Sequence, residues 1–584
     1  MASTLTSPGV LSIENDQSFI TQQPITVGAA IIGPTPLGPV ETPTVVTSYS
    51  DYKNKFGSTF ISGSLVYTYF TSIAAFNYFN NGGESLLVAR VVSGTFSSAF
   101  TSASSATTPT PNGCGILSIN NSESIVLSTI SQGTIMNSSC SLDASGSLNA
   151  SGSQNNIRWQ IANNDTASGT FSLIIREGDD NTNNPVTLET WTNLSMDPTA
   201  PNYVSRVIGN QVKAYNSADN QITVTGDFPN ASKYVYVSAV KTPTPLYFDN
   251  TGIAKAQYTS SIPVNSSGSF AGASGNLFGA GANYYNNIVL SSTNIQGLLS
   301  SSYDNMINLL ANTDDYRFNV LMAPGLFANA SALGSSQVTT IINNTMNRGD
   351  NIFVSDLVPF SSSITEVINA SNAKNTSYAA SYWPWVQTVD PDSAQLVWVP
   401  ASTMIGGIYA YNDSVSEPWF APAGINRGGL SSVVRAEKKL SQANRDTLYT
   451  NKVNPIATFP GTGVVVYGQK TLQTKASALD RVNVRRLLIA LKSYIGQVAN
   501  NLVFEQNTIA TRTNFLNQVN PYLESVQQRQ GLYAFKVIMD SSNNTPDVID
   551  RNQLVGQIYI QPTKTAEFIY LNFNILPTGA TFPA

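Results

Sequence analysis

Residues 316–357 read YRFNVLMAPGLFANASALGSSQVTTIINNTMNRGDNIFVSDL, and this stretch decides the fold class. Near its two ends, 318–322 and 352–357 are short apolar runs that predict strands, and 337–346 has the apolar spacing of an amphipathic helix. A strand, a helix and a second strand in this order predict a βαβ unit with a right-handed crossover. Because parallel strands need both faces covered, the unit predicts an α/β core built on a mixed sheet.

Further apolar runs on both sides of this unit extend the core. A helix rich in aromatic residues is expected at 65–79, because Asn80, Asn81, Gly82 and Gly83 follow it as a stop signal. Strands are expected at 25–33, 44–47, 85–92 and 461–468, and further core residues at 396–399 and 405–411. We therefore assign the α/β core to residues 23–92 and 281–475.

Between the two halves of this core the composition changes. Residues 93–280 are rich in Ser, Thr, Asn and Gly, and short runs of β-forming residues alternate there with turn residues. The runs that predict strands are 116–119, 171–176, 221–225 and 234–237. We expect an all-β insertion that faces the solvent. Its hydroxyl-rich and amide-rich surface suits either glycan binding or a solubilising exterior.

The last hundred residues predict an α+β domain, which we assign to residues 476–564. Apolar residues recur every three or four positions over 480–505, so this helix should bury one stripe. A second helix is expected at 512–529, kinked or interrupted at Pro521. Strands are expected at 533–539, 556–561 and 566–575.

Both ends of the chain have the pattern of extended arms, 1–22 and 565–584. The first is polar apart from a short alternating run, and the second contains a strand with apolar side chains on both faces. Such a strand should be covered on both sides, although it lies close to the chain end. The apolar arm residues are Val10, Leu11, Ile13, Phe568, Ile569, Tyr570, Leu571 and Phe573.

The composition excludes several classes of protein. Of the 584 residues, 42% are hydrophobic and 11% are charged, which indicates a chain that folds. Lys and Arg total 30 against 35 Asp and Glu, and this net charge of −5 disfavours a nucleic-acid partner. The absence of histidine removes Ser/His/Asp and Cys/His catalysis. Without a signal peptide or about 18 consecutive apolar residues, we expect assembly in a cytoplasm and no membrane insertion.

Motifs for cofactors and metals are incomplete in this sequence. Gly461 and Gly463 lack the third glycine and the helix of a dinucleotide site, and Lys470 comes one residue late for a phosphate loop. Cys114 and Cys140 have no histidine to complete a zinc site, which leaves one disulfide or two free thiols. We expect no catalytic, cofactor-binding or metal-binding residues and no enzyme activity.

The charges are unevenly distributed along the chain. Residues 427–492 hold twelve basic and three acidic side chains, a local net charge of +9, so the rest of the chain carries −14. This asymmetry suits head-to-tail contact between copies or docking of a basic face on an acidic protein. The alternatives are a solvated charged face and, less favoured, nucleic acid, because aromatic residues are not interleaved with these cations.

Several motifs in the same order resemble the tail sheath proteins of contractile bacteriophage tails. The resemblance covers both ends and the centre of the chain, and the insertion is poorly matched. The similar segments are 7–10, 193–198, 323–325, 382–385, 400–402, 418–423, 468–472, 481–487, 544–546 and 566–569.

The resemblance implies a function. In such sheaths the two arms are exchanged between neighbouring subunits and add strands to a small sheet in each copy. The implied role is a helical homo-oligomer with six-fold rings around an inner tail tube, which contracts to drive the tube through the host envelope for genome delivery. The implied partners are other copies, the tube protein, and the baseplate and tail terminator proteins, in a virion assembled in the host cytoplasm. Alternatives are the sheath of a contractile bacteriocin or secretion machine, and a secreted adhesin or surface-layer protein.

The basic carboxyl-terminal helices suggest a surface for the tube. We predict that their arginines make weak, salt-screened contacts with it that break on contraction. For Arg485 and Arg486, an ion pair within the subunit is the alternative. The candidates are Arg481, Arg485, Arg486, Arg512 and Arg529.

Overall fold

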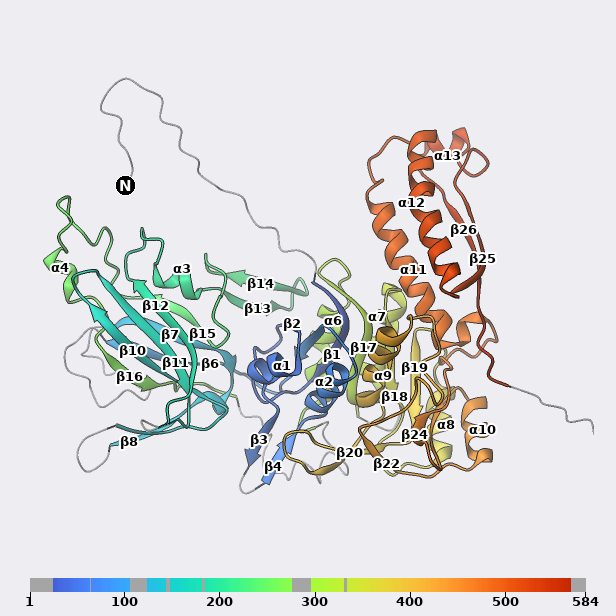
Figure 1. Ribbon diagram of the computed structural model, residues 1–584, viewed down its shortest axis with the longest axis horizontal. Coiled ribbons are helices and arrows are strands. Elements are labelled where there is room, and N and C mark those ends of the chain that lie inside the picture. The colour runs from blue at the N-terminus through green and yellow to red at the C-terminus, as the bar shows by residue number, and fades with distance from the viewer. Residues whose placement is uncertain are drawn as a thin grey trace, which may run out of the picture.

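The computed structural model describes residues 25–62, 65–104, 123–142, 148–180, 184–275, 296–329 and 333–568. Figure 1 shows a mainly β region with two short helices, α3 and α4, on one side, an α/β core in the centre and a domain with long helices beyond the core. The mixed α/β content with a large sheet that the sequence predicts is confirmed.

Eight strands form the main sheet in the spatial order β2-β5-β1-β17-β18-β19-β23-β24. The inner strands are parallel, and the edge strands β2 and β24 run antiparallel to their neighbours. The predicted βαβ unit is β17, helix α7 and β18, in which Val320 lies opposite Ile352. The bounds are β1 Ile25–Gly33, β2 Thr44–Val46, β5 Leu86–Arg90, β17 Tyr316–Phe327, β18 Ile352–Asp356, β19 Ala379–Trp383, β23 Asn454–Phe459 and β24 Gly463–Val466.

Helices cover both faces of this sheet. On one face, Met322 of β17 shares a buried cluster with Ile73 of α2 and Ile405 of α9. On the other face, Phe353 of β18 shares a cluster with Ile341 of α7. The predicted core segment 405–411 therefore lies in a helix. The bounds are α1 Tyr49–Phe56, α2 Phe70–Asn80, α6 Asp304–Leu309, α7 Ser335–Arg348, α8 Ile364–Asn372, α9 Ser402–Val415 and α10 Gln442–Thr450, with the 3-10 turn η2 Ser300–Tyr303.

Two smaller sheets complete the core. The expected helix 65–79 is wrong in its first turn, because Leu65–Thr68 is strand β4, paired antiparallel with β3, Thr59–Ser62. Tyr67 of β4 stacks on Phe60 of β3, so cross-strand aromatic packing favours the strand there. Strands β20 (Val386–Val389), β21 (Leu396–Val399) and β22 (Val433–Ala436) form a separate antiparallel sheet.

Residues 98–275 contain mainly strands. Ile157, Trp159 and Ile161 of β10 alternate with more exposed residues, so this strand buries one face. Its sheet, β12-β11-β10-β16, shares a buried cluster with the sheet β15-β7-β6. The expected strand 116–119 lies outside the described residues. The bounds are β6 Ser98–Ser104, β7 Glu123–Gln132, η1 Thr134–Met136, β8 Ser139–Leu142, β9 Leu148–Ser151, β10 Ile157–Asp165, β11 Thr170–Glu177, β12 Thr187–Ser195, α3 Val204–Ile208, β13 Val212–Asn216, β14 Gln221–Thr225, β15 Val235–Val240, α4 Ala256–Thr259 and β16 Ser266–Ser269.

The carboxyl-terminal part is a helical hairpin with a two-stranded sheet (Figure 1). The apolar stripe of α11, Leu487, Leu491 and Val498, packs in one cluster with α12 and the sheet. Helix α12 continues through Pro521, so the proline does not interrupt it. The bounds are η3 Ala478–Asp480, α11 Val482–Asn500, α12 Ile509–Gln528, β25 Leu532–Ile538, α13 Pro546–Asp550 and β26 Gln557–Pro562.

A buried carboxylate at the end of β18 caps helix α9. Ala401, the residue before α9, has no side chain that can cap the helix. Asp356 takes this role, because its carboxylate accepts hydrogen bonds from the backbone N–H of Ser402 at 3.1 Å and from its hydroxyl at 2.6 Å. Burial raises the pKa of Asp356 to about 6, against the effect of the Ser402 hydrogen bonds.

This carboxylate should make stability depend on pH. Between the ordinary pKa of 3.8 and about 6, the folded state binds more protons at Asp356 than the unfolded state does. Its contribution to the free energy of unfolding is therefore greatest below pH 4 and falls by about 3 kcal/mol as the pH rises through 6. We expect Asp356→Asn to remove this fall, measured by urea unfolding at pH 4 and pH 7. Equal pH dependence in the variant and the original chain would contradict the prediction.

Candidate assembly site at the root of the carboxyl-terminal arm

After strand β26 the chain leaves the carboxyl-terminal domain and returns to the α/β core. The backbone N–H of Thr563 still bonds the carbonyl of Gly531 inside that domain, at 3.2 Å. Four residues further on, Glu567 lies among residues of the core instead. Residues 565–567 are therefore the root from which the predicted carboxyl-terminal arm departs.

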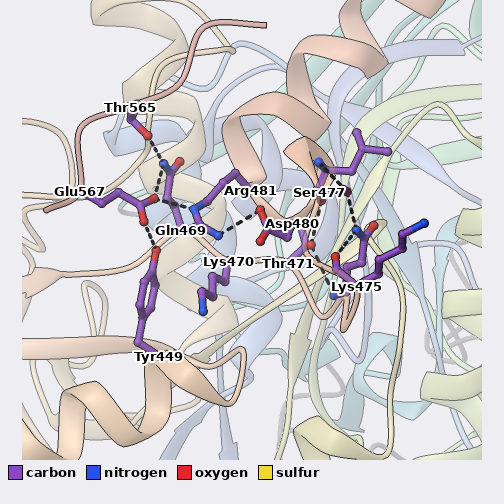
Figure 2. Close-up of polar contacts among 12 residues, drawn as sticks. Tyr449, Gln469, Lys470, Thr471, Lys475, Ser477, Asp480, Arg481, Thr565 and Glu567 are labelled. Carbon is purple, nitrogen blue, oxygen red and sulfur yellow. Dashed lines mark hydrogen bonds and ion pairs between the residues drawn. The ribbon is translucent and has the colours of Figure 1, made fainter.

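Three donors hold the Glu567 carboxylate, two from the core and one from the start of the carboxyl-terminal domain (Figure 2). The hydroxyl of Tyr449, on α10, donates to Oε2 at 2.8 Å. The Gln469 amide and the Arg481 Nε donate to Oε1 at 3.0 and 2.8 Å. The same Gln469 amide nitrogen also donates to the Thr565 hydroxyl at 2.6 Å. We name Tyr449, Gln469, Arg481, Thr565 and Glu567 the arm-root cluster.

The electrostatics of the arm-root cluster keep two of its donors, Tyr449 and Arg481, protonated. Burial and the neighbouring Glu567 raise the pKa of Tyr449, so its hydroxyl keeps its proton and donates. Burial opposes the charge on Arg481, but Tyr449 and Glu567 outweigh it and raise the pKa of the guanidinium. The side chains of Arg481 and Glu567 are 24% and 17% exposed, which strengthens their ion pair relative to a fully solvated one. The cluster therefore fixes the start of the arm to its own core.

The two-stranded sheet β25-β26 offers places for added strands. Phe535, Val537 and Ile560 pack towards the helices, whereas Tyr533 and Tyr559 are 64% and 55% exposed. Within the described part of the chain, each of the two strands pairs only with the other. Unpaired edges bind further strands readily, and a two-stranded sheet is marginal by itself.

Most of the predicted arm residues lie outside the described residues. These are Val10, Leu11, Ile13, Ile569, Tyr570, Leu571 and Phe573. Phe568 is the last described residue, directly after the arm root, and is 68% exposed. Residues 566–568 are not in a strand, so the expected strand 566–575 does not begin at its predicted start.

The arginines predicted to face a tube have different environments. Arg485 and Arg486 are both 4% exposed. The Arg486 guanidinium pairs with Asp413 at 2.5 Å, and Arg485 lies 3.9 Å from the ring centre of Tyr378. For Arg486 this is the ion pair within the subunit that the sequence left as the alternative.

The remaining three candidates also have partners inside the subunit. Arg481 belongs to the arm-root cluster, and Arg512 is 8% exposed and donates to Asn507 at 3.0 Å. Arg529 pairs with Glu417 at 2.7 Å, yet its side chain is 46% exposed. Tube contact stays a prediction, for which Arg529 is the most accessible of the five candidates.

Sequence reasoning gave no role to the carboxylate at the centre of the arm-root cluster. Glu567 and Gln469 appeared only as parts of motifs, and Tyr449 was not singled out. The sequence did contain one signal, because Glu567 is the only carboxylate in the apolar strand expected at 566–575. A buried carboxylate needs a hydrogen-bond or ion-pair partner, so its presence there indicates a contact.

The described residues include no group of three or more acidic or cysteine side chains placed to hold a metal ion. None of the described helices is both long enough and apolar enough to cross a membrane. Cys114 lies outside the described residues.

Comparisons with known proteins agree with this architecture. Residues 301–472 match the model of the phage tail sheath protein central domain, and residues 474–576 match that of the phage tail sheath C-terminal domain. The tail sheath protein of Salmonella phage ViI is 28% identical over 440 residues, which cover 71% of this chain and 67% of that protein. A sheath tail protein from Listeria innocua shares the fold with a TM-score of 0.51 at 9% identity, over 92% of this chain and 95% of that one.

Two further relatives match more strongly over a shorter region. The tail sheath protein of Vibrio phage KVP40 is 42% identical over 208 residues, which are 36% of this chain. That of Enterobacteria phage T4 is 42% identical over 185 residues, which are 32% of this chain. The chain spans less than a third of the length of these two proteins, 31% and 28%. The core and the carboxyl-terminal domain are those of a structural protein of a phage tail. The chain contains the central and C-terminal domains of the phage tail sheath family.

Proposed function

We propose that this protein is the structural subunit of a contractile tail sheath. It polymerises helically around an inner tail tube in a metastable extended state, and contraction drives the tube through the host envelope to deliver the genome. The observation that carries the proposal is the match to the central and C-terminal sheath domains, in that order, across residues 301–576.

The subunits are joined by exchanged arms. Residues 1–22 and 565–584 reach neighbouring copies and add strands to the open edges of β25 and β26. An added strand with six to ten backbone hydrogen bonds gains several kcal/mol, at roughly 0.5 to 1.5 kcal/mol each. Because each arm is rooted in one subunit and paired in another, subunits can rotate and slide without separating. A contact of this head-to-tail kind generates a helical tube when its rotation includes a rise.

Contraction is a switch between two packings of the same lattice. A preference of about 5.5 kcal/mol per cooperative unit moves a two-state population from 1:99 to 99:1, and many subunits add their preferences. The energy is stored when the sheath assembles in its extended form. The partners are therefore other copies, the tube protein, and the baseplate and tail terminator proteins, in a virion assembled in the bacterial cytoplasm.

The regions of the chain divide this work. Residues 23–92 and 281–475 form the sheath core, 476–564 form the assembly domain with the receiving sheet, and 93–280 lie on the outside of the sleeve. The same division would serve the sheath of a contractile bacteriocin or secretion machine, but the tail sheath proteins described above as similar in sequence come from phages.

Removal of either arm tests this function. We expect the purified chain to form striated hollow sleeves in negative-stain micrographs. Deletion of residues 1–20, or of 569–584 so that Glu567 remains, should leave a folded subunit that no longer forms sleeves. Circular dichroism melting provides the control for folding. Sleeves formed by both truncated chains at the original protein concentration would contradict arm exchange, and flat lattices or monomers of the full chain would contradict the sheath.

A further inference from the structure

Five cations gather around residues 371–378, the end of helix α8 and the loop that connects it to strand β19, which together we call the loop. They come from the loop itself, from the turn after α10, from the segment after β24 and from helix α11. We name them the basic hub: Lys374, Lys452, Lys475, Arg485 and Lys492.

Lys452 joins the loop to the segment that carries Lys475. Its ammonium donates to the backbone carbonyls of Ser371 and Lys374 at 3.2 and 2.9 Å, and to the Thr474 hydroxyl at 3.2 Å. The backbone N–H of Thr474 in turn donates to the Asn375 side chain at 2.9 Å. Lys475 is the next residue and is exposed. In Figure 2 its side chain extends away from the arm-root cluster.

Arg485 and Lys492 meet the same loop through one tyrosine. The Arg485 guanidinium lies 3.9 Å from the ring centre of Tyr378 and donates to the Ser377 hydroxyl. The Lys492 ammonium donates to the Tyr378 hydroxyl at 3.2 Å. All five cations therefore contact this loop or directly follow a residue that does.

Within the described residues, none of the five cations of the hub forms an ion pair. Their partners are backbone carbonyls, hydroxyls and an aromatic ring, which hold a cation without neutralising it. Burial lowers the pKa of Lys374 and Lys452, and no carboxylate offsets that effect. Arg486, beside Arg485 in sequence, contrasts with the hub because it pairs with Asp413.

A merely solvated basic face does not account for the buried members of the hub. Arg485 and Lys452 are 4% and 7% exposed, and covered cations without a counter-charge are costly. Residues outside 427–492 carry a net charge of −14, so the remaining surface of another copy supplies the opposite charge. We propose that the basic hub is an interface that receives an acidic surface of a second copy of this chain. The inference rests on one part of the proposed function, namely that copies of this chain assemble with one another.

Reversing the charges of the three hub lysines that are not buried tests the hub. The variant carries Lys374→Glu, Lys475→Glu and Lys492→Glu, which leaves the buried Lys452 and Arg485 in place. The control carries Lys213→Glu, Lys233→Glu and Lys241→Glu, three exposed lysines of residues 98–275 that have no ion pair within the described residues and give the same change in net charge. Melting curves show that both variants fold, and sedimentation measures the protein concentration needed for self-association.

We expect the hub variant to need at least about tenfold more protein than the control to associate at an ionic strength of about 0.05 M, where screening is weak. The original chain and the control should associate more weakly on raising the salt to about 0.5 M, and the hub variant should respond less. A hub variant within about twofold of the control overturns the proposal. A hub variant that self-associates like the control but does not coat tubes also overturns the proposal, because the hub would then bind the tube. Electron micrographs of the associated original chain test the proposed function separately. If the chain associates into anything other than hollow sleeves, the sheath function is contradicted, but the comparison of the hub variant with the control stays valid.

Discussion

Replacing Arg90 with methionine should lower the free energy of unfolding by about 3 to 5 kcal/mol. Arg90 ends strand β5 and is fully buried. Its guanidinium donates to the backbone carbonyls of Thr35 and Pro36 at 3.2 and 3.1 Å, to that of Gln132 at 2.9 Å, and to that of Gly38. Methionine keeps most of the apolar stem and leaves all four carbonyls without this donor.

The loss is large because this arginine joins two parts of the chain. Thr35, Pro36 and Gly38 belong to the proline-rich loop after β1, and prolines give such a loop few N–H donors of its own. Gln132 ends β7, so the same side chain ties the all-β region to the core. Burial lowers the pKa of Arg90 to about 9, against the effects of Tyr69 and Tyr52. Its acceptors are neutral carbonyls, so the folded state holds this cation by hydrogen bonds and by the ring of Phe96, whose centre lies 5.4 Å from the guanidinium carbon.

Urea unfolding of Arg90→Met measures the effect, and limited proteolysis shows whether the loop at 34–39 opens. Arg551→Met is the control, because its side chain is 61% exposed and its loss should change stability by at most about 0.5 kcal/mol. Arg90→Lys should recover part of the loss, since one ammonium can reach some of the carbonyls. A loss below about 1 kcal/mol for Arg90→Met would show that the loop finds other donors.

The parts of the fold that the sequence predicted are those with local causes. The unit of β17, α7 and β18 was evident because its apolar periodicities change between strand and helix within 42 residues of continuous chain. The apolar stripe of α11 was evident for the same reason. At 65–68 the pattern failed, because pairing with β3 decides the conformation there and a run of apolar and aromatic residues suits a strand or a helix equally.

The candidate site could not be predicted, because its contacts join residues far apart in the chain. The three donors to Glu567 lie 118, 98 and 86 residues before it. Arg486 points inward because α9 presents Asp413, 73 residues away. The charge count along the sequence identified residues 427–492 as basic. It could not show which of their cations form ion pairs and which lie against aromatic rings.

Glu567→Lys should impair assembly far more than folding. The new ammonium would face Arg481 in place of the carboxylate, with Lys470 also beside Tyr449, so the arm root should detach from the core. The subunit loses a partly exposed ion pair and two further hydrogen bonds, about 1 to 3 kcal/mol. The carboxyl-terminal domain keeps its own cluster and should stay folded.

The effect on assembly follows from the entropy of the freed root. If residues 565–567 lose their fixed conformation, an arm that pairs with a neighbour must order them at about 1 kcal/mol or more per residue. About 3 kcal/mol corresponds to a roughly hundredfold weaker link, and each subunit in a sleeve depends on several such links. We therefore expect the protein concentration needed for sleeves to rise at least about tenfold, measured by sedimentation and electron microscopy.

Two matched variants separate the role of the cluster from that of charge. Lys564→Glu reverses an exposed charge in the same segment without touching the cluster and should assemble normally. Glu567→Gln keeps one carbonyl acceptor for Tyr449 or Arg481 and should fall between the two, because a neutral acceptor holds a guanidinium less strongly than a carboxylate does. If Glu567→Lys assembles as readily as Lys564→Glu, the arm is positioned by its pairing in the neighbouring copy, and its root carries no part of the link.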